Sequence, residues 1–475
     1  MRTAVALAGT DILSRFAAIV GERYAITDPA AQAPYLVEMR GLYASRTPMV
    51  LRPGSVAEVA AILKLAWETA TAIVPQGGNT GMVGGAVADE SRDEIILSLT
   101  RLDKIREVDP ASSTMTCEAG VVLANAQAAA ADPDRLFPLS LGGEGSATIG
   151  GNLSTNAGGT GALAYGVARD LVLGVEVVLA DGSVMNGLNK LKKDNTGYDL
   201  KNLFIGAEGT LGVITAAVLK LFPRPRSIAT AFIGVPSPEA ALALLNLARD
   251  RAAGTVTGFE IMPRLLIEFA VKHGPGIRDP LGSAHPWYVL FEITSQASEG
   301  LSTSVEDFLA HAAERGLVDD AVIAANLDQA KALWRLRHLL TEVQNPEGGS
   351  IKHDVSVPVA AVPAFIAEAT AAAQALIPGC RPVPFGHLGD GNIHFNVTQP
   401  AGSDKQEYLD RWDAMNERVH DVVAKFGGSI SAEHGIGLLK RDLLPKVKDP
   451  VAIAMMRALK RTLDPKGILN PGKVL

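Results

Sequence analysis

The sequence predicts an α+β fold with two principal parts, and three observations support this prediction. Short apolar runs of strand character alternate with amphipathic helical segments along the 475 residues. The glycine-rich segments gather between Gly77 and Gly212, whereas all nine histidines lie at or after His273. A chain of this length exceeds one ordinary hydrophobic core. The uneven glycine and histidine content therefore assigns different tasks to the two halves.

The composition describes an ordinary globular protein, with 47% hydrophobic and 20% charged residues. The net charge of −7 and the absence of a basic stripe argue against a nucleic-acid partner. Two cysteines cannot build a disulfide framework, which indicates a reducing compartment: the cytoplasm, or the mitochondrial matrix in a eukaryote. No apolar run reaches the length of a transmembrane helix, and residues 1–21 are interpreted as a first helix rather than a signal peptide.

The first half reads as a helical lead-in followed by strands, one helix and glycine-rich loops. Residues 1–45 form the lead-in. The expected elements are a strand and turn at 47–55, an amphipathic helix at 56–70, a strand entering a glycine-rich loop at 72–85, short strands within 94–109 and 113–123, a hairpin at 171–185, and a strand at 212–223 stopped by Pro223.

The second half begins after the two prolines of FPRPRS (222–227). Its expected elements are a strand at 228–235 and helices at 239–250, 333–343, 361–377, 403–426 and 449–463. We therefore expect four segments: the lead-in at 1–45, a first domain at 46–224, a second at 225–425, and a C-terminal segment at 426–475 that returns to the first domain.

Three glycine-rich segments predict a ligand site in the first half: residues 75–85, 142–161 and 206–215. Glycine permits a positive φ and close approach, so several backbone N–H groups can point at one anion. Three such loops suggest a long ligand that carries a diphosphate. The dinucleotide fingerprint of the doubly wound fold fits poorly. Gly159, Gly161 and Ala164 have its spacing, but no apolar strand precedes them and no suitable acid follows.

In the second half, GHLGDGNIHFNV (386–397) places two histidines around Asp390-Gly391. A type I′ turn at this pair would set His387 opposite His394, with Cβ atoms about 5 Å apart. Two neutral imidazoles at that distance can share one metal ion. Asn396 would lie on the face of His394. The alternative is that both are polar residues of an exposed hairpin.

The segment SAEHGIG (431–437) supplies a carboxylate and an imidazole side by side, Glu433 and His434. In a regular strand they would point to opposite faces, but on a turn or loop both can approach one centre. Two histidines and one carboxylate suit zinc or another divalent ion with open positions. His434 would then be a neighbouring or catalytic group.

Cationic side chains nearby in the sequence suit an acidic substrate. Arg337 and Thr341 are four residues apart on a predicted helix and would share a face. Arg337 offers a fork that matches a carboxylate, and Lys352 offers a point charge. Taken singly, each cation also fits an ordinary solvated surface charge.

The glycine-rich motifs together resemble a known family. AIVPQGGNTGMVGG (72–85), ATIGGNLSTNAGG (147–159) and GAEGTLGVIT (206–215) resemble the FAD-binding domain of the vanillyl-alcohol oxidase/p-cresol methylhydroxylase superfamily, and GILNPGKVL (467–475) resembles its C-terminal flavin-contacting segment. The resemblance covers nearly the whole chain and implies a two-part FAD-binding domain, an α+β substrate or cap domain and a C-terminal helical segment. Because no histidine precedes His273, we expect non-covalent FAD. The implied FAD-contacting residues are Pro75, Gly77, Gly78, Asn79, Thr80, Gly81, Gly145, Ser146, Gly150, Gly151, Asn152, Thr155, Asn156, Glu208, Ile214 and Asn470.

The second half resembles the branch of D-2-hydroxyglutarate dehydrogenases, D-lactate dehydrogenases and glycolate oxidase subunits. The shared motifs are R-x-x-x-T, K-H-D-x-S-V-P, G-H-L-G-D-G-N-x-H-x-N and E-H-G-x-G. The resemblance implies oxidation of a D-2-hydroxy acid, with hydride passing from C2 to the flavin. It further implies a divalent metal, expected to be zinc, held by His387, His394 and Glu433. Arg337, Thr341, Lys352, Asn396 and His434 would contact the substrate, with His434 as the catalytic base.

Several alternatives stay open. Two cations suit a dicarboxylate such as D-2-hydroxyglutarate better than D-lactate, which is the second candidate substrate. A zinc hydrolase built on the same ligands, or a flavin-bearing subunit without activity, would be different classes of protein. The electron acceptor is open among electron-transfer flavoprotein, a quinone and a cytochrome. The oligomeric state is also open, with a homodimer as one option.

Overall fold

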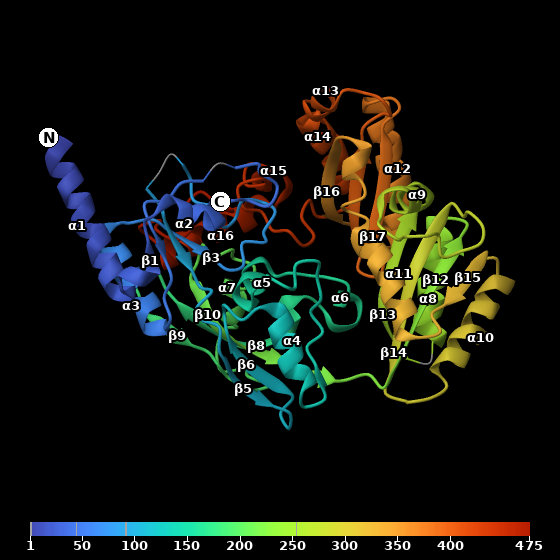
Figure 1. The fold of residues 1–475 in the computed structure, drawn as a ribbon, viewed down its shortest axis with the longest axis horizontal. Helices are drawn as coiled ribbons and strands as arrows, with labels where there is room; N and C mark the ends of the chain where they lie inside the picture. Colours follow the sequence, from blue (N-terminus) through green and yellow to red (C-terminus); the bar gives the residue numbers. More distant parts are fainter. Residues whose placement is uncertain (1, 44, 91–92, 253) are drawn as a thin grey trace. The chain divides into compact units, whose positions relative to one another are not determined.

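A computed structural model describes residues 2–43, 45–90, 93–252 and 254–475. The chain divides into two compact units. Unit 1 comprises Met1–Gly159, Gly166–Pro223 and Glu433–Leu475, and unit 2 comprises Thr160–Tyr165 and Arg224–Ala432. Both units combine helices with sheets, which confirms the predicted α+β class (Figure 1).

Unit 1 contains two principal sheets, in agreement with a two-part domain. One has the order β1-β2-β4-β3 and the other the order β5-β6-β10-β8-β9. The strands are β1 (Ala25–Ile26), β2 (Val50–Leu51), β3 (Ile73–Gln76), β4 (Ile95–Ser98), β5 (Ile105–Asp109), β6 (Thr114–Glu118), β8 (Val172–Val178), β9 (Val184–Asn186) and β10 (Val213–Lys220). The helices are α1 (Arg2–Val20), α2 (Pro29–Leu36), α3 (Val56–Thr69), α4 (Leu123–Ala131), α5 (Ile149–Thr155), α7 (Lys201–Phe204), α15 (Leu444–Val447) and α16 (Pro450–Leu463), with 3-10 turns η1 (Glu22–Tyr24) and η2 (Ala168–Leu171).

Helix α3 illustrates how the sequence pattern builds the core of unit 1. The Ser55 side chain accepts a hydrogen bond from the Glu58 backbone N–H and so caps the helix N-terminus. Val59, Ile62 and Leu63 are fully buried, as their helical spacing predicts. They join a cluster that includes strand residues of the first sheet. Burial of each such side chain contributes about 1.5–3 kcal/mol.

In unit 1, one predicted element is confirmed and two others differ from the prediction. The hairpin at 171–185 is confirmed: β8 pairs with β9, and Gly182 has a φ of 86° in the turn. The lead-in is not purely helical, because β1 pairs with β2. The strand predicted up to Pro223 ends earlier, at Lys220. Pro223 instead belongs to β11 (Phe222–Pro223), which pairs with β7 (Arg135–Leu136).

Unit 2 is built on one antiparallel sheet of seven strands, in the order β15-β12-β14-β13-β17-β18-β16 (Figure 1). The strands are β12 (Ser227–Val235), β13 (Thr255–Pro263), β14 (Trp287–Ser295), β15 (Asp320–Ile323), β16 (Ser350–Ser356), β17 (Arg381–His387) and β18 (Asn392–Thr398). The other elements are α6 (Ala162–Tyr165), α8 (Pro238–Arg251), α9 (Arg264–His273), α10 (Leu301–Glu314), α11 (Leu327–Leu339), η3 (Asn345–Glu347), η4 (Val359–Ala361), α12 (Val362–Leu376), α13 (Lys405–Leu409) and α14 (Trp412–Lys425).

Helices cover both faces of this sheet. Phe232, Leu290 and Phe385 share a cluster with residues of α9 and α11, which defines the α9/α11 face. On the other face, Phe291 stacks on Phe308 of α10 and Phe395 contacts Phe365 of α12. The alternation of adjacent residues such as Leu290 and Phe291 follows from the two-residue period of a strand.

One segment among the described residues, 359–376, is long and apolar enough to span a membrane by length and composition. The sequence-based statement that no run reaches this length was therefore wrong. Phe365, Ile366 and Ala369 form the buried face of α12, which packs on β17 and β18. This packing accounts for the apolar character of the helix.

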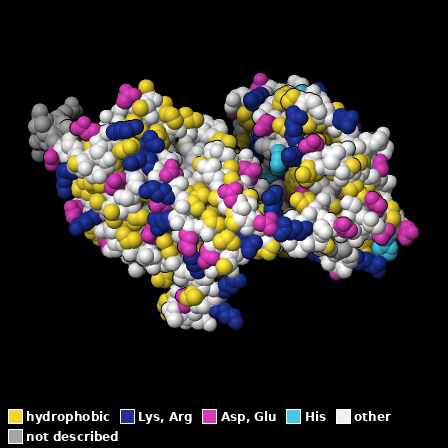
Figure 2. Space-filling view, turned by 60° about the horizontal axis from the view of Figure 1, so that its bottom comes forward, with side chains coloured by type: hydrophobic (Ala, Val, Ile, Leu, Met, Phe, Trp, Pro, Cys, Tyr) yellow, Lys and Arg dark blue, Asp and Glu magenta, His cyan; other side chains and the backbone are white. Residues whose placement is uncertain are grey.

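The structure shows a surface of mixed charge and two buried free cysteines. On the face in Figure 2, Lys and Arg side chains are interspersed with Asp and Glu. Cys117 and Cys380 are both buried free thiols. Burial raises the pKa of Cys117 to about 12 and that of Cys380 to about 11, so both are weak nucleophiles.

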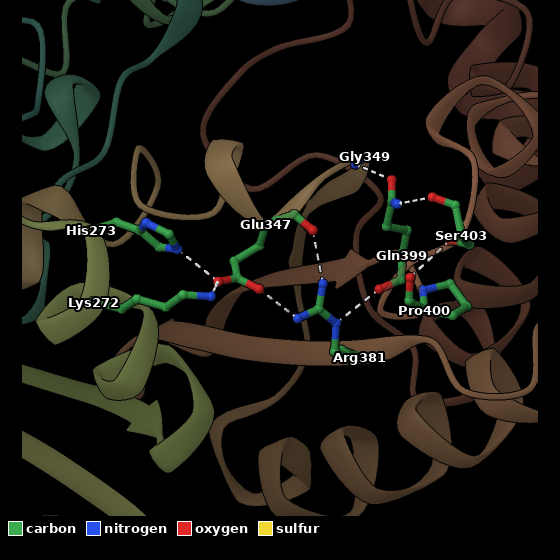
Figure 3. Close-up of polar contacts among 8 residues, drawn as sticks. All are labelled: Lys272, His273, Glu347, Gly349, Arg381, Gln399, Pro400 and Ser403. Atoms are coloured by element: carbon green, nitrogen blue, oxygen red, sulfur yellow. Dashed lines mark hydrogen bonds and ion pairs between the residues drawn. The ribbon is translucent and has the colours of Figure 1, made fainter.

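A polar network joins several elements of unit 2 around Glu347 (Figure 3). The Glu347 carboxylate accepts hydrogen bonds of 2.7 Å from Lys272, His273 and Arg381. Arg381 also donates to the carbonyl oxygens of Glu347 and Gln399. The bond from Lys272, opposed by burial and reinforced by those from His273 and Arg381, lowers the pKa of Glu347 from 4.5 to about 2.

We expect Glu347→Gln to lower the free energy of unfolding by about 1–3 kcal/mol at pH 7, because it removes the charge from these hydrogen bonds. A lowered carboxyl pKa stabilises the fold above the unfolded pKa, and that stability is lost as the pH falls through the folded pKa. The difference in the free energy of unfolding between the native protein and Glu347→Gln should stay constant from pH 7 to 5 and shrink below about pH 4.5. Urea unfolding across this pH range measures it.

The control is Lys272→Met. The Lys272 side chain is 65% exposed, so its pairing is screened and the change should cost less than about 1 kcal/mol. Equal destabilisation by both variants would contradict the expectation that the exposed Lys272 contributes less to stability than the Glu347 carboxylate as a whole.

Candidate functional site

The predicted site residues that lie on the strands of unit 2 share one face of its sheet. Directly paired residues in an antiparallel sheet project to the same side. His394 pairs with Phe385, whose side chain lies in the cluster under α9 and α11. Asn396, two residues further along β18, pairs with Lys352 of β16. His394, Asn396, Lys352 and His387 therefore all project from the α9/α11 face.

The hairpin register differs from the prediction. His387 pairs with Asn392, and Phe385 pairs with His394. Residues 388–391 form the connection, and of Asp390 and Gly391 only Gly391 has a positive φ, 81°. The predicted type I′ turn, which needs a positive φ at both positions, was therefore wrong. His387 and His394 are diagonal neighbours, and the two-residue offset keeps them on one face.

The two imidazoles nevertheless lie close together. Their ring centroids are 5.7 Å apart with an interplanar angle of 76°. One ring nitrogen of each lies within 4.8 Å of one on the other. This arrangement within unit 2 can supply two nitrogen ligands to one metal ion.

The connection between these histidines is held from two sides. Arg249 Nη2 donates to the Gly389 carbonyl oxygen at 2.9 Å. A Cβ at Gly389 would lie 2.5 Å from Leu163 Cδ1, so the Leu163 side chain packs directly against this glycine. Leu163 comes from the short segment Thr160–Tyr165 that belongs to unit 2. The contacts fix the ends of both histidine-bearing strands.

A buried carboxylate accompanies each imidazole. Glu260 Oε1 lies 2.6 Å from His387 Nδ1, and Asp354 Oδ1 lies 3.9 Å from His394 Nδ1. Metal-bound histidines commonly contact a carboxylate through the second ring nitrogen, which fixes the ring orientation and tautomer. The contact with Glu260 fits an imidazole of His387 that coordinates a metal through Nε2, whereas the 3.9 Å separation of His394 from Asp354 is longer than a hydrogen bond.

Glu260 also contacts Arg337, whose Nε donates to Glu260 Oε2 at 2.7 Å. Burial alone would raise the pKa of Glu260, but the charges of Arg337 and His387 lower it to about 2. Glu260 is therefore a carboxylate at neutral pH although only 1% of it is exposed. Sequence analysis missed this residue. The available signal was a single acid within the apolar strand TVTGFEIMP.

The predicted substrate-binding residues have distinct surroundings. The terminal nitrogens of Arg337 make no hydrogen bond with any described residue, and its guanidinium lies 4.9 Å from the Phe385 ring centroid. Helix α11 ends at Leu339, so Thr341 lies in the following turn and the helix predicted over 333–343 ends earlier than expected. Lys352 Nζ donates to the Thr341 carbonyl oxygen at 3.4 Å. Asn396 Nδ2 donates to Gln344 Oε1.

In unit 1, the first glycine-rich loop follows β3 and presents backbone donors. Residues 77–81 donate no backbone hydrogen bond to any described residue. The loop packs tightly on the second one: a Cβ at Gly78 would lie 1.9 Å from the Ser146 carbonyl oxygen, and one at Gly77 would lie 2.4 Å from Thr148 Oγ1. Accessible N–H groups on a loop of this kind fit the diphosphate of FAD.

Polar atoms near these loops also fit a cofactor. Asn152 Nδ2 and Asn470 Oδ1 are buried and have no hydrogen-bond partner among the described residues. A buried unpaired polar atom costs about 1–3 kcal/mol. A cofactor that supplies the complementary groups would remove this cost, so both asparagines suit FAD binding.

The remaining predicted FAD contacts lie in unit 1 and several organise the loops. Asn79 Nδ2 donates to the Val37 carbonyl oxygen, and Thr155 Oγ1 to that of Gly151. Asn156 Oδ1 accepts from the Arg169 N–H. Pro75 lies on β3 and Ile214 is buried on β10, whereas Thr80 and Gly81 lie in the first loop, Gly145 and Ser146 in the second, and Gly150 in α5. Asn79, Asn156, Glu208 and Asn470 all have a positive φ.

The Glu433–His434 pair lies in a loop, so the two adjacent side chains are not forced to opposite faces as they would be in a strand. Within unit 1, Glu208 accepts hydrogen bonds from the N–H groups of Ile436 and Gly437 at 2.7 and 2.9 Å. Burial raises the pKa of Glu208, and these two N–H groups oppose that shift. A Cβ at Gly158 would lie 2.8 Å from Glu433 Oε1. The loop is thus anchored to the glycine-rich part of unit 1.

We expect Asn152→Leu to weaken FAD binding about 5–10-fold while leaving the apoprotein at least as stable as the native chain. The substitution removes a donor that FAD would engage and also removes an unpaired buried amide from the apoprotein. FAD titration by fluorescence quenching and thermal unfolding with and without FAD measure the two effects. Unchanged FAD affinity would contradict this role for Asn152.

Comparisons with known proteins place both halves among flavoproteins. Residues 47–187 match the family described as "FAD binding domain", and residues 224–474 match "FAD linked oxidases, C-terminal domain". A probable mitochondrial D-2-hydroxyglutarate dehydrogenase of Oryza sativa subsp. indica is 39% identical over 99% of this chain and 83% of its own length. The mitochondrial enzyme of Bos taurus is 40% identical over 95% of this chain and 81% of its own. The D-2-hydroxyglutarate dehydrogenase of Xanthomonas citri pv. viticola is 36% identical over 94% of this chain and 93% of its own length.

Solved structures support the fold. p-Cresol methylhydroxylase with bound substrate superposes with a TM-score of 0.77 at 18% sequence identity, covering 98% of this chain and 96% of that protein. The predicted resemblance of the glycine-rich half to this superfamily is confirmed at the level of fold. Both halves of the chain therefore have the fold of one known architecture.

Proposed function

The chain belongs to the D-2-hydroxyglutarate dehydrogenase family of FAD-linked oxidoreductases, and we propose that it oxidises D-2-hydroxyglutarate to 2-oxoglutarate by hydride transfer from C2 to FAD. The observation that carries the choice of substrate is the pair of cations at the α9/α11 face, Arg337 and Lys352. A substrate with two carboxylates matches two cations.

Non-covalent FAD is proposed for unit 1. When bound, the flavin would accept the hydride, which is chemistry that no side chain of the chain supplies. The support is that the N–H groups of residues 77–81, Asn152 Nδ2 and Asn470 Oδ1 have no hydrogen-bond partner among the described residues. None of the three glycine-rich segments contains a histidine for covalent attachment. Release of all FAD on acid denaturation would agree with the proposal.

We further propose that His387, His394 and Glu433 bind a divalent metal, with zinc as the expected ion. When bound, the metal would act as a Lewis acid toward the substrate hydroxyl. The support is the pair of adjacent imidazoles, each accompanied by a buried carboxylate. Glu433 directly follows Ala432, whose N–H donates to the carbonyl oxygen of Asp354 on β16. Two histidines and one carboxylate form a suitable ligand set.

The other side chains would bind the substrate and move its proton. Arg337 would bind a carboxylate through its terminal nitrogens while Glu260 holds its Nε. Lys352 would neutralise the second carboxylate, and Thr341 and Asn396 would donate hydrogen bonds. His434 would accept the hydroxyl proton as general base.

D-Lactate is the second candidate substrate, and Lys352→Met discriminates between the two. We expect this variant to lower kcat/KM for D-2-hydroxyglutarate about 10–100-fold, because it removes a charged hydrogen bond worth about 1.5–3 kcal/mol. Turnover of D-lactate, which lacks the second carboxylate, should change little. Steady-state kinetics with an artificial acceptor measure both. Equal loss with both substrates would assign Lys352 to the C1 carboxylate and contradict the dicarboxylate proposal.

The electron acceptor is proposed to be electron-transfer flavoprotein, a quinone or a cytochrome. The rice and bovine relatives are named mitochondrial. We propose a matrix or cytoplasmic location according to the type of cell, and a homodimer as the assembly to test by light scattering.

A further inference from the structure

We infer that Glu260 is a positioning residue that couples the metal-binding side of the site to its substrate-binding side. One carboxylate contacts both partners: Oε1 lies 2.6 Å from His387 Nδ1, and Oε2 accepts from Arg337 Nε at 2.7 Å. This inference rests on the proposed roles of His387 as a metal ligand and Arg337 as a substrate contact. All three residues lie within unit 2.

The pairing of β13 with β17 brings Glu260 next to His387. Glu260 of β13 pairs directly with His387, the last residue of β17, so their Cβ atoms lie about 5 Å apart on one face. The Leu388 N–H, one residue further, donates to the Phe259 carbonyl oxygen at 3.1 Å and extends the pairing into the connection. Arg337 reaches the same carboxylate from α11.

Burial makes both contacts specific. Glu260 is 1% exposed and the Arg337 side chain 8%. A buried carboxylate is costly unless it is paired, and here each oxygen has its own charged or polar donor. The Arg337 guanidinium is further held against the Phe385 ring. Turning either Arg337 or His387 away would break a contact of Glu260, so this carboxylate links the positions of the two side chains.

Each contact has a different consequence for the reaction. Accepting the Nδ1 proton of His387 fixes the tautomer that presents Nε2 and increases the basicity of that nitrogen. Holding Nε of Arg337 directs its two terminal nitrogens as a fixed fork, which suits a carboxylate. Loss of Glu260 should therefore weaken two measurable quantities, metal affinity and substrate affinity, although Glu260 touches neither ligand.

The test is Glu260→Gln in the FAD-loaded full-length chain. A glutamine can accept from only one of the two donors through its single oxygen. We expect Zn²⁺ affinity, measured by competition with a chromophoric chelator, to fall about 10–100-fold. We also expect KM for D-2-hydroxyglutarate to rise at saturating Zn²⁺. Glu260→Asp keeps the charge but is too short to span both partners, so it should shift both quantities in the same direction by less.

Glu292→Gln is the matched control. Glu292 lies on the same face of the neighbouring strand β14 and also contacts α11, through Trp334 Nε1 at 2.6 Å. It contacts neither His387 nor Arg337 among the described residues. A merely structural role for Glu260 predicts similar effects of both variants on folding, with unchanged Zn²⁺ affinity. Native Zn²⁺ affinity and KM in Glu260→Gln, or equal shifts in Glu292→Gln, would overturn the inference.

Two further measurements test the inference if Glu260→Gln fails to fold or if its two effects need to be separated. If Glu260→Gln does not fold, native metal and substrate affinities in Glu260→Asp would overturn the inference. In an Arg337→Ala background, Glu260→Gln should no longer raise KM but should still weaken Zn²⁺ binding. Failure of the unmodified enzyme to oxidise D-2-hydroxyglutarate would instead contradict the proposed function, and the Zn²⁺ titration would still test the link between Glu260 and His387.

Discussion

His434→Ala is expected to retain FAD and to lose reduction of that FAD by substrate, by about 10²–10⁴-fold. A general base contributes to the chemical step only, whereas the proposed FAD contacts lie in the glycine-rich loops of unit 1. The loop that carries His434 is fixed by hydrogen bonds from Ile436 and Gly437 to Glu208, and none of these involves the imidazole. Anaerobic stopped-flow measurement of flavin bleaching gives the rate directly.

His311→Ala is the control for this variant. His311 lies on α10 with 36% of its side chain exposed, 3.8 Å from Glu314, and has no proposed role. It should bleach at the native rate. Partial recovery of His434→Ala with added imidazole would strengthen the assignment, because a free base can replace a missing one. Native bleaching rates in His434→Ala would remove His434 from the mechanism.

His394→Ala is expected to lose bound metal and, with it, at least about 10³-fold in substrate-driven flavin reduction. The proposed ligands would hold a Lewis acid, which when bound would contribute several kcal/mol of stabilisation to the charge that develops on the substrate hydroxyl. FAD content should stay native, because His394 lies on β18 of unit 2 and the proposed FAD contacts lie in unit 1. Metal analysis by mass spectrometry and bleaching kinetics measure the two effects on one sample.

Chelated native protein supplies the comparison for His394→Ala. Added Zn²⁺ should restore bleaching to the chelated native protein but not to the variant, which lacks a ligand. His311→Ala again serves as the neutral histidine variant. Full activity of metal-depleted native protein, verified by metal analysis, would contradict a metal-dependent mechanism.

The elements that sequence reasoning placed well are those with strong local signals. Helix α3 and the hairpin of β8 and β9 follow from apolar periodicity and an Asp-Gly turn. The register around His387 could not be fixed in this way. The pairing of β17 and β18 is set jointly by their neighbours β13 and β16, and the four-residue connection is held by Arg249 and Leu163. Tertiary contacts, not the Asp-Gly pair, decided that register.

In the candidate site, too, residues with a local sequence signal were predicted and a residue placed by tertiary contacts was not. His387, His394, Glu433 and His434 were recognised from motifs, because each motif is local in the sequence. Glu260 lies 127 residues before His387 and belongs to no such motif. Only the pairing of β13 with β17 brings it into contact. The extension of α11 to Thr341 failed for a related reason, since the turn after Leu339 leads into η3.

Anaerobic flavin bleaching by a panel of hydroxy acids, with and without a chelator, is the decisive test of the proposed function. We expect D-2-hydroxyglutarate to bleach the bound FAD, L-2-hydroxyglutarate to leave it oxidised, and D-lactate to bleach it more slowly. Chelation should abolish the bleaching and added Zn²⁺ should restore it. Bleaching that is equal for both enantiomers, or absent with every D-2-hydroxy acid in the presence of Zn²⁺, would contradict the proposed function.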